Sequence, residues 1–536
     1  MTKPAPGAEL KAERARARAA EADLARAHAV IRAQAEQISA VHRSTSWRVT
    51  RPLRVLVRLL RGQTSLSQLM RRIAPALLAP LDRALTMRRQ RVEAARLAAV
   101  TRPQPRAVAF PGEGDLATLP ELTGIVPEPL AATVSVIIPT YNAGPEFAWL
   151  LRKLSAQQGL ARVEIVVVDS GSTDGTWELA QASGCKVIRI PNSEFSHSHA
   201  RNLGADNAAG DLFLFTVQDA YPIGDFWLQS LARALISPRS EDQRVAAVSC
   251  SELPRRDSEL LYNAGIDTHY RFLGCDSRDR IGAFTGEDNQ ALRTQGQLSD
   301  VACMIPAGTF HVYRYQGRYA EDLLLGVRLI RDGLRTAMLS SVKVIHSHNR
   351  PAAYHLKRTF VDVVFLTEVF PDFAPPLAES VGAAVAAAAA LDRVTQAWRP
   401  LLGADAGLSL RRLVAQARAI PLPPLMQGAA PDFGFAPLAG WLKAALAVEG
   451  APDRREGEQV RTMFVDRLEG LAAFCERTYG ATDAHLADEL CAAARKTLAA
   501  TVGAQLAFFY LHQSRLDSDR NRQVVAELRD LMLAGV

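Results

Sequence analysis

The sequence predicts an α/β fold, in which a mostly parallel, Rossmann-like sheet lies between two helical regions. Three observations support this prediction. Short apolar runs rich in Val, Ile and Phe occupy residues 133–138, 163–168 and 211–215. They show no polar alternation, as expected of strands that are buried on both faces of a sheet. Each run leads through polar or small residues into a helical pattern, which indicates repeated βα units.

Length and composition indicate a cytoplasmic protein of two or three domains. The chain has 536 residues, of which 48% are hydrophobic, enough for ordinary packed cores. No run approaches the roughly 18 to 20 apolar residues that a membrane-spanning helix needs, and the N-terminus lacks the apolar core of a secretory signal. The 6 cysteines have no CxxC spacing, so we expect reduced thiols rather than a zinc site or a disulfide framework.

Residues 1–42 have a helical pattern with a weak heptad repeat. Small or apolar residues recur every seven positions at Leu10, Ala17, Leu24, Ile31 and Ile38. The companion positions are mostly polar or alanine, so the predicted coiled coil is marginal. Two interpretations stay open, a homo-oligomer formed through this helix and a solvated single helix.

Residues 43–100 form a basic, amphipathic region that holds most of the positive charge of the chain. Thirteen arginines and only two acidic residues lie between Arg43 and Arg96, whereas the whole chain has a net charge of +7. Arginine stems and Trp47 suit the headgroup layer of an anionic membrane. The alternative is that these helices pack on the next domain and leave their arginines in water. Nucleic acid is a poorer fit, because no recognition fold is evident.

Three further segments complete the domain prediction. Residues 101–130 contain six prolines and little periodicity, and read as a linker. Residues 131–375 hold the predicted sheet. Residues 376–536 begin with an alanine-rich helical segment, and the pattern over 458–475 has one apolar face. We therefore predict a separate C-terminal helical domain, which carries no chemical motif.

The carboxyl ends of the predicted strands are the first place to look for a functional site, because ligands of open α/β sheets bind there. Pro139 ends the first strand, since proline cannot continue a central ladder. Polar side chains follow the strands at Thr140, Tyr141, Asn142, Asp169 and Asp219. An ordinary βα turn is the alternative explanation for these residues.

The motifs VSVIIPTYN, VVVDSGSTDGT, ARNLGA, TVQDA, AEDLLLGVRLIRDG and VIHSHN occur in this order. Together they resemble the family-two glycosyltransferases, which have the GT-A fold and transfer a sugar from a nucleoside diphosphate with inversion. FSHSHARNLGA, TVQDA and HSHN look most similar to the bacterial rhamnosyltransferase-type branch, which builds surface polysaccharide. The resemblance covers residues 131–373, under half of the chain.

The resemblance implies a donor site at the ends of the first strands. In the family, the segment after the first strand lines the nucleotide base pocket, a carboxylate after the second strand accepts the imide N–H of the base, and an arginine approaches the base or the diphosphate. The residues of this sequence implied in donor binding are Pro139, Thr140, Tyr141, Asn142, Asp169, Ser170, Arg201, Asn202, Gln218 and Asp219.

The resemblance also implies a divalent metal ion, Mg²⁺ or Mn²⁺. Val217, Gln218 and Asp219 occupy the place of the acidic metal-binding triplet, which leaves Asp219 as its sole carboxylate. A late histidine often completes the metal or diphosphate site in such enzymes, and His346 and His348 are the candidates. Packed or solvated histidines are the alternative.

Inverting transfer needs a base that removes the proton of the acceptor hydroxyl. The resemblance assigns this role to Asp322, with Glu321 beside it at the start of a predicted helix. Helix capping is the alternative for both, because acidic residues are common in a first turn. Asp300 is implied as a contact to the acceptor sugar.

We therefore expect an enzyme that extends a surface glycan, such as O-antigen or capsule, from a nucleotide sugar, with dTDP-rhamnose as the candidate donor. The acceptor is lipid-linked or a polysaccharide, and the protein is peripheral at the inner face of the cytoplasmic membrane. The alternative is a catalytically weak GT-A scaffold in a polysaccharide assembly complex, suggested by Val217 and the large flanking regions. A nucleotide-cofactor oxidoreductase is disfavoured, because neither GxGxxG nor GxxxxGK occurs.

Overall fold

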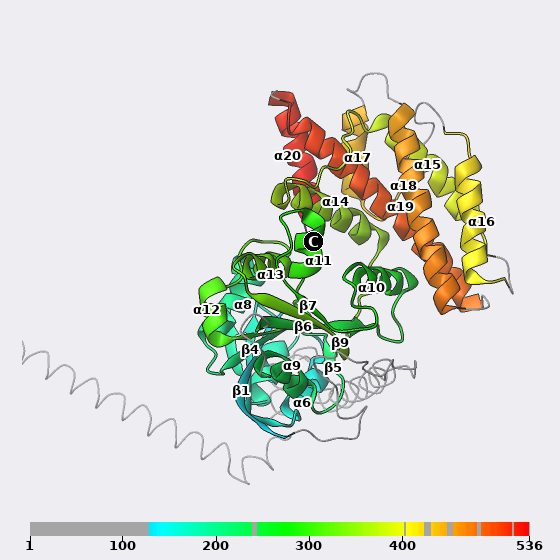
Figure 1. The fold of residues 1–536 in the computed structure, drawn as a ribbon. Coiled ribbons are helices and arrows are strands. Elements are labelled where there is room, and N and C mark those ends of the chain that lie inside the picture. The colour runs from blue at the N-terminus through cyan, green and yellow to red at the C-terminus, as the bar shows by residue number, and fades with distance from the viewer. Residues whose placement is uncertain are drawn as a thin grey trace, which may run out of the picture. The chain divides into compact units, whose positions relative to one another are not determined.

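The computed structural model of the protein describes residues 128–237, 244–400, 404–422, 430–446, 454–479, 484–516 and 519–534 (Figure 1). The predicted coiled coil over residues 1–42 and the basic region over residues 43–100 lie outside this part of the chain. So does nearly all of the predicted linker over residues 101–130. These three assignments stay predictions.

The described residues contain a nine-stranded sheet with the order β3-β2-β1-β4-β8-β6-β9-β5, and β7 pairs with β9. Its strands are β1 (Leu130–Thr140), β2 (Leu160–Asp169), β3 (Lys186–Arg189), β4 (Leu212–Thr216), β5 (Tyr221–Pro222), β6 (Val245–Leu253), β7 (Arg280–Gly282), β8 (Ala302–Pro306) and β9 (Arg335–Ile345). The three strands predicted from apolar runs are confirmed as β1, β2 and β4.

The sheet is mostly parallel, with one antiparallel strand at its centre. β1 runs parallel to β2 and β4, and β6 runs parallel to β9. β8 lies between β4 and β6 and is antiparallel to both. The amino end of β8 therefore meets the carboxyl ends of β4 and β6, and one edge of the sheet collects loops from both halves.

Helices and a 3₁₀ turn connect these strands. They are α6 (Phe147–Ser155), α7 (Thr176–Ala182), η1 (Asn192–Glu194), α8 (His197–Asp206), α9 (Trp227–Ile236), α10 (Leu260–Phe272), α11 (Asn289–Gly296), α12 (Ala307–Tyr313), α13 (Glu321–Arg331) and α14 (Ala352–Val369). Arg201 lies in α8, before β4, and the prediction that Glu321 and Asp322 begin a helix is confirmed.

Both faces of the sheet are covered by apolar side chains, which explains the continuous apolar runs. Val136 and Ile138 of β1 belong to a cluster with Phe147 of α6 and Trp227 of α9. Ile137, between them, belongs to a second cluster that includes Phe310 of α12. Successive side chains of a strand point to opposite faces, so a strand between two helical layers is apolar at every position.

The C-terminal helices are α15 (Gly382–Ala397), α16 (Ala406–Ala419), α17 (Ala436–Leu446), α18 (Arg454–Thr478), α19 (Ala484–Gln513) and α20 (Asp519–Leu533) (Figure 1). They share one apolar cluster with Leu260 of α10 and with Leu356 and Phe360 of α14. Helices were predicted here, and the boundary between residues 375 and 376 stays a prediction. None of the helices in the described ranges combines the length and the apolar character that crossing a bilayer requires.

Candidate active site

The predicted site residues gather at the edge of the sheet where the parallel strands end. β1 and β2 end at the paired residues Thr140 and Asp169. Thr216 of β4 pairs with Ala302 of β8. Asp219 follows β4 and Asp300 precedes β8, so both residues lie at the same edge of the sheet. Leu253 of β6 pairs with Ile345 of β9, and the histidine motif begins at the next residue. Polar groups from five strands therefore meet at one edge.

Asp169 ties the ends of β1 and β2 together. Its carboxylate is fully buried. Oδ2 accepts hydrogen bonds from the hydroxyls of Thr140 at 3.0 Å and Ser172 at 2.5 Å. Oδ1 accepts from the backbone N–H groups of Gly171 and Ser172 at 3.2 and 3.0 Å. The hydroxyl of Ser170 donates to the carbonyl of Thr140 at 2.9 Å. Contact of Asp169 with a nucleotide base stays a prediction.

The turns after β1 and β2 are held to each other by side chains. The backbone N–H of Asn142 donates to the hydroxyl of Ser172 at 2.8 Å, and Oδ1 of Asn142 accepts from the N–H of Thr173 at 2.9 Å. Asp174 accepts hydrogen bonds from the N–H groups of Gly144 and Thr176, at the start of α7. These hydrogen bonds join the two turns into one rim.

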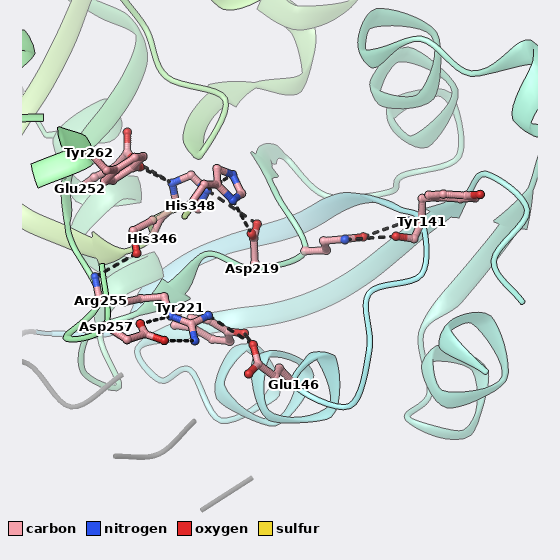
Figure 2. A network of polar contacts seen from close by, with 12 residues as sticks. Tyr141, Glu146, Asp219, Tyr221, Glu252, Arg255, Asp257, Tyr262, His346 and His348 are labelled. Atoms are coloured by element: carbon pink, nitrogen blue, oxygen red, sulfur yellow. Dashed lines mark hydrogen bonds and ion pairs between the residues drawn. The ribbon is translucent and has the colours of Figure 1, made fainter. Parts of the chain in front are cut away.

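Tyr141 lies on this rim and is exposed, with 49% of the residue accessible to solvent. Its backbone is held by the side chain of Gln218. The N–H of Tyr141 donates to Oε1 of Gln218 at 2.9 Å, and Nε2 of Gln218 donates back to the carbonyl of Tyr141 at 3.3 Å (Figure 2). Gln218 thus fixes the peptide of Tyr141 and leaves its ring free.

Asp219 faces His346 and His348, which follow β9 (Figure 2). Oδ1 of Asp219 lies 3.7 Å from Nε2 of His346, and Oδ2 lies 3.5 Å from Nδ1 of His348. The Nε2 atoms of the two histidines are 3.1 Å apart. One ligand atom from each of the three residues falls within 4.8 Å of the others, a spacing that suits one metal ion. The structure therefore brings the three predicted metal ligands together.

Glu252, at the end of β6, contacts the opposite nitrogen of His346. Its Oε2 lies 2.6 Å from Nδ1, and the hydroxyl of Tyr262 donates to the same oxygen at 2.8 Å. Burial acts to raise the pKa of Glu252, but the hydrogen bond and charge of His346 outweigh it and lower this pKa. Burial would lower the pKa of His346, and the bond with Glu252 raises it. Burial and the charge of His346 lower the pKa of His348 to about 4.

The predicted base lies in a second cluster, built around Arg201. The guanidinium of Arg201 is buried, and its Nη1 lies 2.8 Å from Asp300 and 2.5 Å from Glu321. Oδ2 of Asp322 accepts from the N–H of Asp300 at 3.4 Å, and Oδ1 from the N–H of Leu323 at 2.7 Å. Arg201 thus pairs with the residues next to the predicted base, and its contact with the donor stays a prediction.

Asn202, the neighbour of Arg201, supports this cluster from the side. Its amide donates to the carbonyl of Tyr315 at 3.0 Å and accepts from the N–H of the same residue at 3.1 Å. The ring of Tyr315 in turn lies 5.5 Å from the guanidinium of Arg201. Both hydrogen-bonding ends of the Asn202 amide are therefore used within the protein.

Charge and burial shift the pKa values of the three carboxylates in this cluster in different directions. Burial, and then the charge of Glu321, raise the pKa of Asp322 to about 6. Burial also raises the pKa of Asp300 well above its ordinary value. Burial acts to raise the pKa of Glu321, but the charge of Arg201 outweighs burial and lowers this pKa. Asp322 therefore binds a proton more tightly than an ordinary aspartate, and a carboxyl with a pKa of about 6 is still mostly ionised near neutral pH.

Sequence reasoning missed Glu252 and Tyr262. Glu252 ends a buried run, VAAVSCSEL, and is followed within two residues by Pro254. This is the signal that identified Asp169, a carboxylate at the carboxyl end of a buried strand. Tyr262 lies in α10 with no local signal, because its partner Glu252 is ten residues away and comes close only in the fold.

Part of the chain matches a known protein family. Residues 135–294 match the model of glycosyl transferase family 2. The chain contains a family 2 glycosyltransferase domain. The protein is therefore a glycosyltransferase enzyme, and its mixed sheet is that of the GT-A fold. The family model covers the residues from β1 to α11, including the Asp169 turn, Arg201, Asp219 and Glu252.

Two similar curated proteins are O-antigen chain rhamnosyltransferases. RfbN of Salmonella typhimurium is 26% identical over 236 residues, which cover 43% of this chain and 72% of RfbN. WbaN of Salmonella anatum is 28% identical over 242 residues, 43% of this chain and 71% of WbaN. A similar solved structure is the mannosyltransferase PcManGT from Pyrobaculum calidifontis in complex with GDP-Man and Mn²⁺. It has a TM-score of 0.34 and 17% identity, and the match covers 76% of this chain and 87% of that one.

Proposed function

We propose that this glycosyltransferase uses a nucleoside-diphosphate sugar and transfers the sugar, with inversion, to a hydroxyl of a growing surface glycan. The observation that carries the proposal is the pair of clusters at one edge of the sheet. One holds Asp219 with two histidines, and the other holds Asp322 with a raised pKa. Together they offer a site for a diphosphate and a base for a hydroxyl.

The rim formed by the β1 and β2 turns suits a nucleotide base. The half-exposed ring of Tyr141 offers a flat apolar surface on which a base stacks, and its backbone is fixed by Gln218. The buried carboxylate of Asp169 lies at the same rim. Because RfbN and WbaN are named rhamnosyltransferases, we propose dTDP-rhamnose as the first donor to test.

The donor set of Asp219, His346 and His348 fits a divalent transition-metal ion. One carboxylate oxygen and two imidazole nitrogens within 4.8 Å suit Mn²⁺ better than Mg²⁺, which favours oxygen ligands in octahedral geometry. Such an ion, when bound, neutralises the charge that develops on the departing diphosphate. Asp219 and the histidines would hold it.

Arg350 supplies a second positive charge beside these residues. Its positive charge opposes protonation of both His346 and His348, although the bond with Glu252 leaves the pKa of His346 raised. The guanidinium lies 5.1 Å from the ring of Tyr354, and its buried Nε has no hydrogen-bond partner. No carboxylate in the described part of the chain pairs with it. We propose that Arg350 contacts the diphosphate oxygens, because an unpaired guanidinium matches phosphate geometry.

Asp322 is the proposed base. It is held by the backbone N–H groups of Asp300 and Leu323, so its oxygens are oriented while the carboxylate keeps a raised pKa. It accepts the proton of the acceptor hydroxyl as that oxygen attacks the anomeric carbon and the bond to the diphosphate breaks. Glu321 is paired with Arg201, so we assign it a supporting role rather than proton transfer.

The experiment that tests the function is a screen of the purified protein with UDP-, dTDP- and GDP-sugars, followed by the variant Asp322→Asn. An amide keeps the shape of the side chain but cannot take the proton. We expect turnover to fall about 10²- to 10⁴-fold with donor affinity nearly unchanged. Asp332→Asn, at the opposite end of α13, is the matched control and should retain activity.

The pH profile gives the same test a second measurement. Asp322 must be ionised to act as base, and its pKa is raised to about 6. The value of kcat/KM should therefore be level above about pH 6 and fall roughly tenfold per pH unit below it. Near-wild-type turnover of Asp322→Asn would remove Asp322 from this role, and no transfer or hydrolysis of any donor would favour a scaffold function instead.

A further inference from the structure

We propose that Glu252 is a positioning residue for the metal site, which fixes the tautomer and the ring orientation of His346 so that Nε2 is presented as a ligand. The inference rests on the proposed metal site of Asp219, His346 and His348. Figure 2 shows Glu252 and Tyr262 on one side of the His346 ring and Asp219 with His348 on the other.

The two nitrogens of His346 have separate environments. Nδ1 lies 2.6 Å from Oε2 of Glu252, within the range of a charge-assisted hydrogen bond. Nε2 lies 3.7 Å from Oδ1 of Asp219 and 3.1 Å from Nε2 of His348. An ionised carboxylate only accepts hydrogen bonds, so the contact with Glu252 requires a proton on Nδ1. In the neutral ring, the lone pair is then on Nε2, the atom that faces Asp219.

Glu252 is itself held in place by the sheet and by two tyrosines. It pairs with Val344 of β9, two residues before His346, and the N–H of His346 donates to the carbonyl of Leu253 at 3.1 Å. The hydroxyl of Tyr262 donates to Oε2 at 2.8 Å, and the hydroxyl of Tyr270 accepts from the N–H of Glu252 at 2.9 Å. The side chain of Glu252 is only 9% exposed, so few other positions are open to it.

This support matters because the contact between the two histidines does not decide which of their nitrogens carries a proton. The Nε2 atoms of His346 and His348 contact each other at 3.1 Å, which requires one to be a donor and the other an acceptor. Without Glu252 either imidazole can take either role, and the His346 ring can turn. Partners that hydrogen-bond the outer nitrogen of a metal-binding histidine remove this freedom and typically contribute 10- to 100-fold, roughly, to metal affinity.

The test is a titration of the full-length protein with Mn²⁺ alone, with free ion measured by electron paramagnetic resonance. We expect Glu252→Gln to weaken Mn²⁺ binding by about 10-fold and Glu252→Ala by up to about 100-fold. Thermal unfolding and nucleotide binding without metal check that each variant is folded. Tyr262→Phe keeps the carboxylate of Glu252 and removes the hydroxyl that lies 2.8 Å from its Oε2 and 3.2 Å from Nδ1 of His346. We expect a loss of a few-fold in Mn²⁺ affinity, and this variant replaces the Glu252 variants if they do not fold.

Glu259→Gln is the matched control. Glu259 forms a similar half-buried pair, with Nε2 of His355 at 3.2 Å, and also contacts Lys496. Its backbone N–H donates to the side chain of Asn349, and this bond survives the substitution. Because His355 is outside the metal cluster, we expect Mn²⁺ affinity to change less than about twofold. If the loss of any His–Glu pair lowered Mn²⁺ affinity, then both Glu252→Gln and Glu259→Gln would bind Mn²⁺ more weakly.

A double-mutant cycle separates a positioning role from a direct one. If Glu252 acts through His346, then Glu252→Gln should have no further effect on Mn²⁺ affinity in a His346→Ala background. Equal Mn²⁺ affinity of wild type and Glu252→Gln would overturn the inference and leave the proposed site intact. A wild-type protein that binds no Mn²⁺ at millimolar concentration would overturn both.

Discussion

Val217 and Gln218 stand where the resemblance places acidic metal-binding residues, and each has another task in this protein. Val217 packs against the apolar cluster on one face of the sheet. Gln218 exchanges two hydrogen bonds with the backbone of Tyr141. Both tasks favour a residue without charge, since one is apolar and the other needs a donor and an acceptor together. The site instead combines Asp219 with His346 and His348 from the end of a distant strand.

This arrangement makes a prediction for Asp219. In Asp219→Ala we expect metal-dependent transfer to fall at least about 100-fold, because the histidines alone lack the carboxylate that binds hard cations. Activity and Mn²⁺ affinity are measured together. Asp211→Asn, at the other end of β4, keeps an oxygen that accepts from Thr133 and should behave as wild type. Full activity of wild type in excess chelator would contradict the metal requirement and point to Arg350 as the group that neutralises the diphosphate.

For single residues, the sequence predicted a position in the fold where the residue lies next to a recognisable strand end. Asp169, Asp219 and His346 follow apolar runs, so their place at one edge was predictable. The pairing of Arg201 with Asp300 and Glu321 was not, since the three residues come together from separate loops and helices. Local patterns place a side chain on an element, and only the fold selects its partner.

At the scale of elements, the sheet order depends on contacts that no local pattern contains. β8 is as apolar as its neighbours, but it is inserted antiparallel between β4 and β6. This insertion brings Asp300, before β8, to the edge where the other strands end. α13 presents Asp322 to Asp300 from its first turn, with the preceding Ala320 in the left-handed conformation at φ 46°. The position of α13 therefore determines the geometry of the proposed base.

A glycine allows α13 to approach its neighbour closely. A Cβ at Gly326 would lie 1.7 Å from the carbonyl oxygen of Gly296 at the end of α11. Gly326→Ala must push the helices apart, so we expect a loss of about 1 to 3 kcal/mol in the free energy of unfolding and reduced turnover as Asp322 moves. Gly265→Ala in α10 is the control, because nothing lies within 4 Å of that Cβ. The control should gain about 0.5 to 1 kcal/mol.

For Gly326→Ala and Gly265→Ala, the free energy of unfolding is measured by chemical denaturation and kcat is measured alongside it. Equal stability of the two glycine variants would mean that α13 tolerates a shift. Lower stability of Gly326→Ala with unchanged kcat would mean that the proposed base does not depend on the packing of this helix.

At the scale of the whole molecule, the enzyme domain and the C-terminal helices are joined by packing contacts as well as by the chain between them. α19 lies against α14, where a Cβ at Gly503 would come 2.0 Å from the carbonyl of Leu356. α14 directly follows the histidine motif, and its residue Leu356 belongs to the apolar cluster of the C-terminal helices. We infer that the C-terminal helices stabilise the loop of the metal site. The sequence predicted these helices from their apolar faces, but it carried no signal for what they support.

The last prediction concerns the basic region over residues 43–100, with its thirteen arginines between Arg43 and Arg96. If it binds the inner leaflet, full-length protein should co-sediment with anionic vesicles, because each basic residue near the surface contributes roughly 1 kcal/mol. Salt should weaken the attachment, since screening shortens the reach of surface charge to about 8 Å near physiological ionic strength. A chain that begins at residue 128 should lose vesicle binding and keep donor binding, because β1 and the later site residues remain. Neutral vesicles are the control. A full-length protein that ignores anionic vesicles at low salt would indicate that the arginines are a solvated face, and that a membrane-bound acceptor, if there is one, is reached without this region.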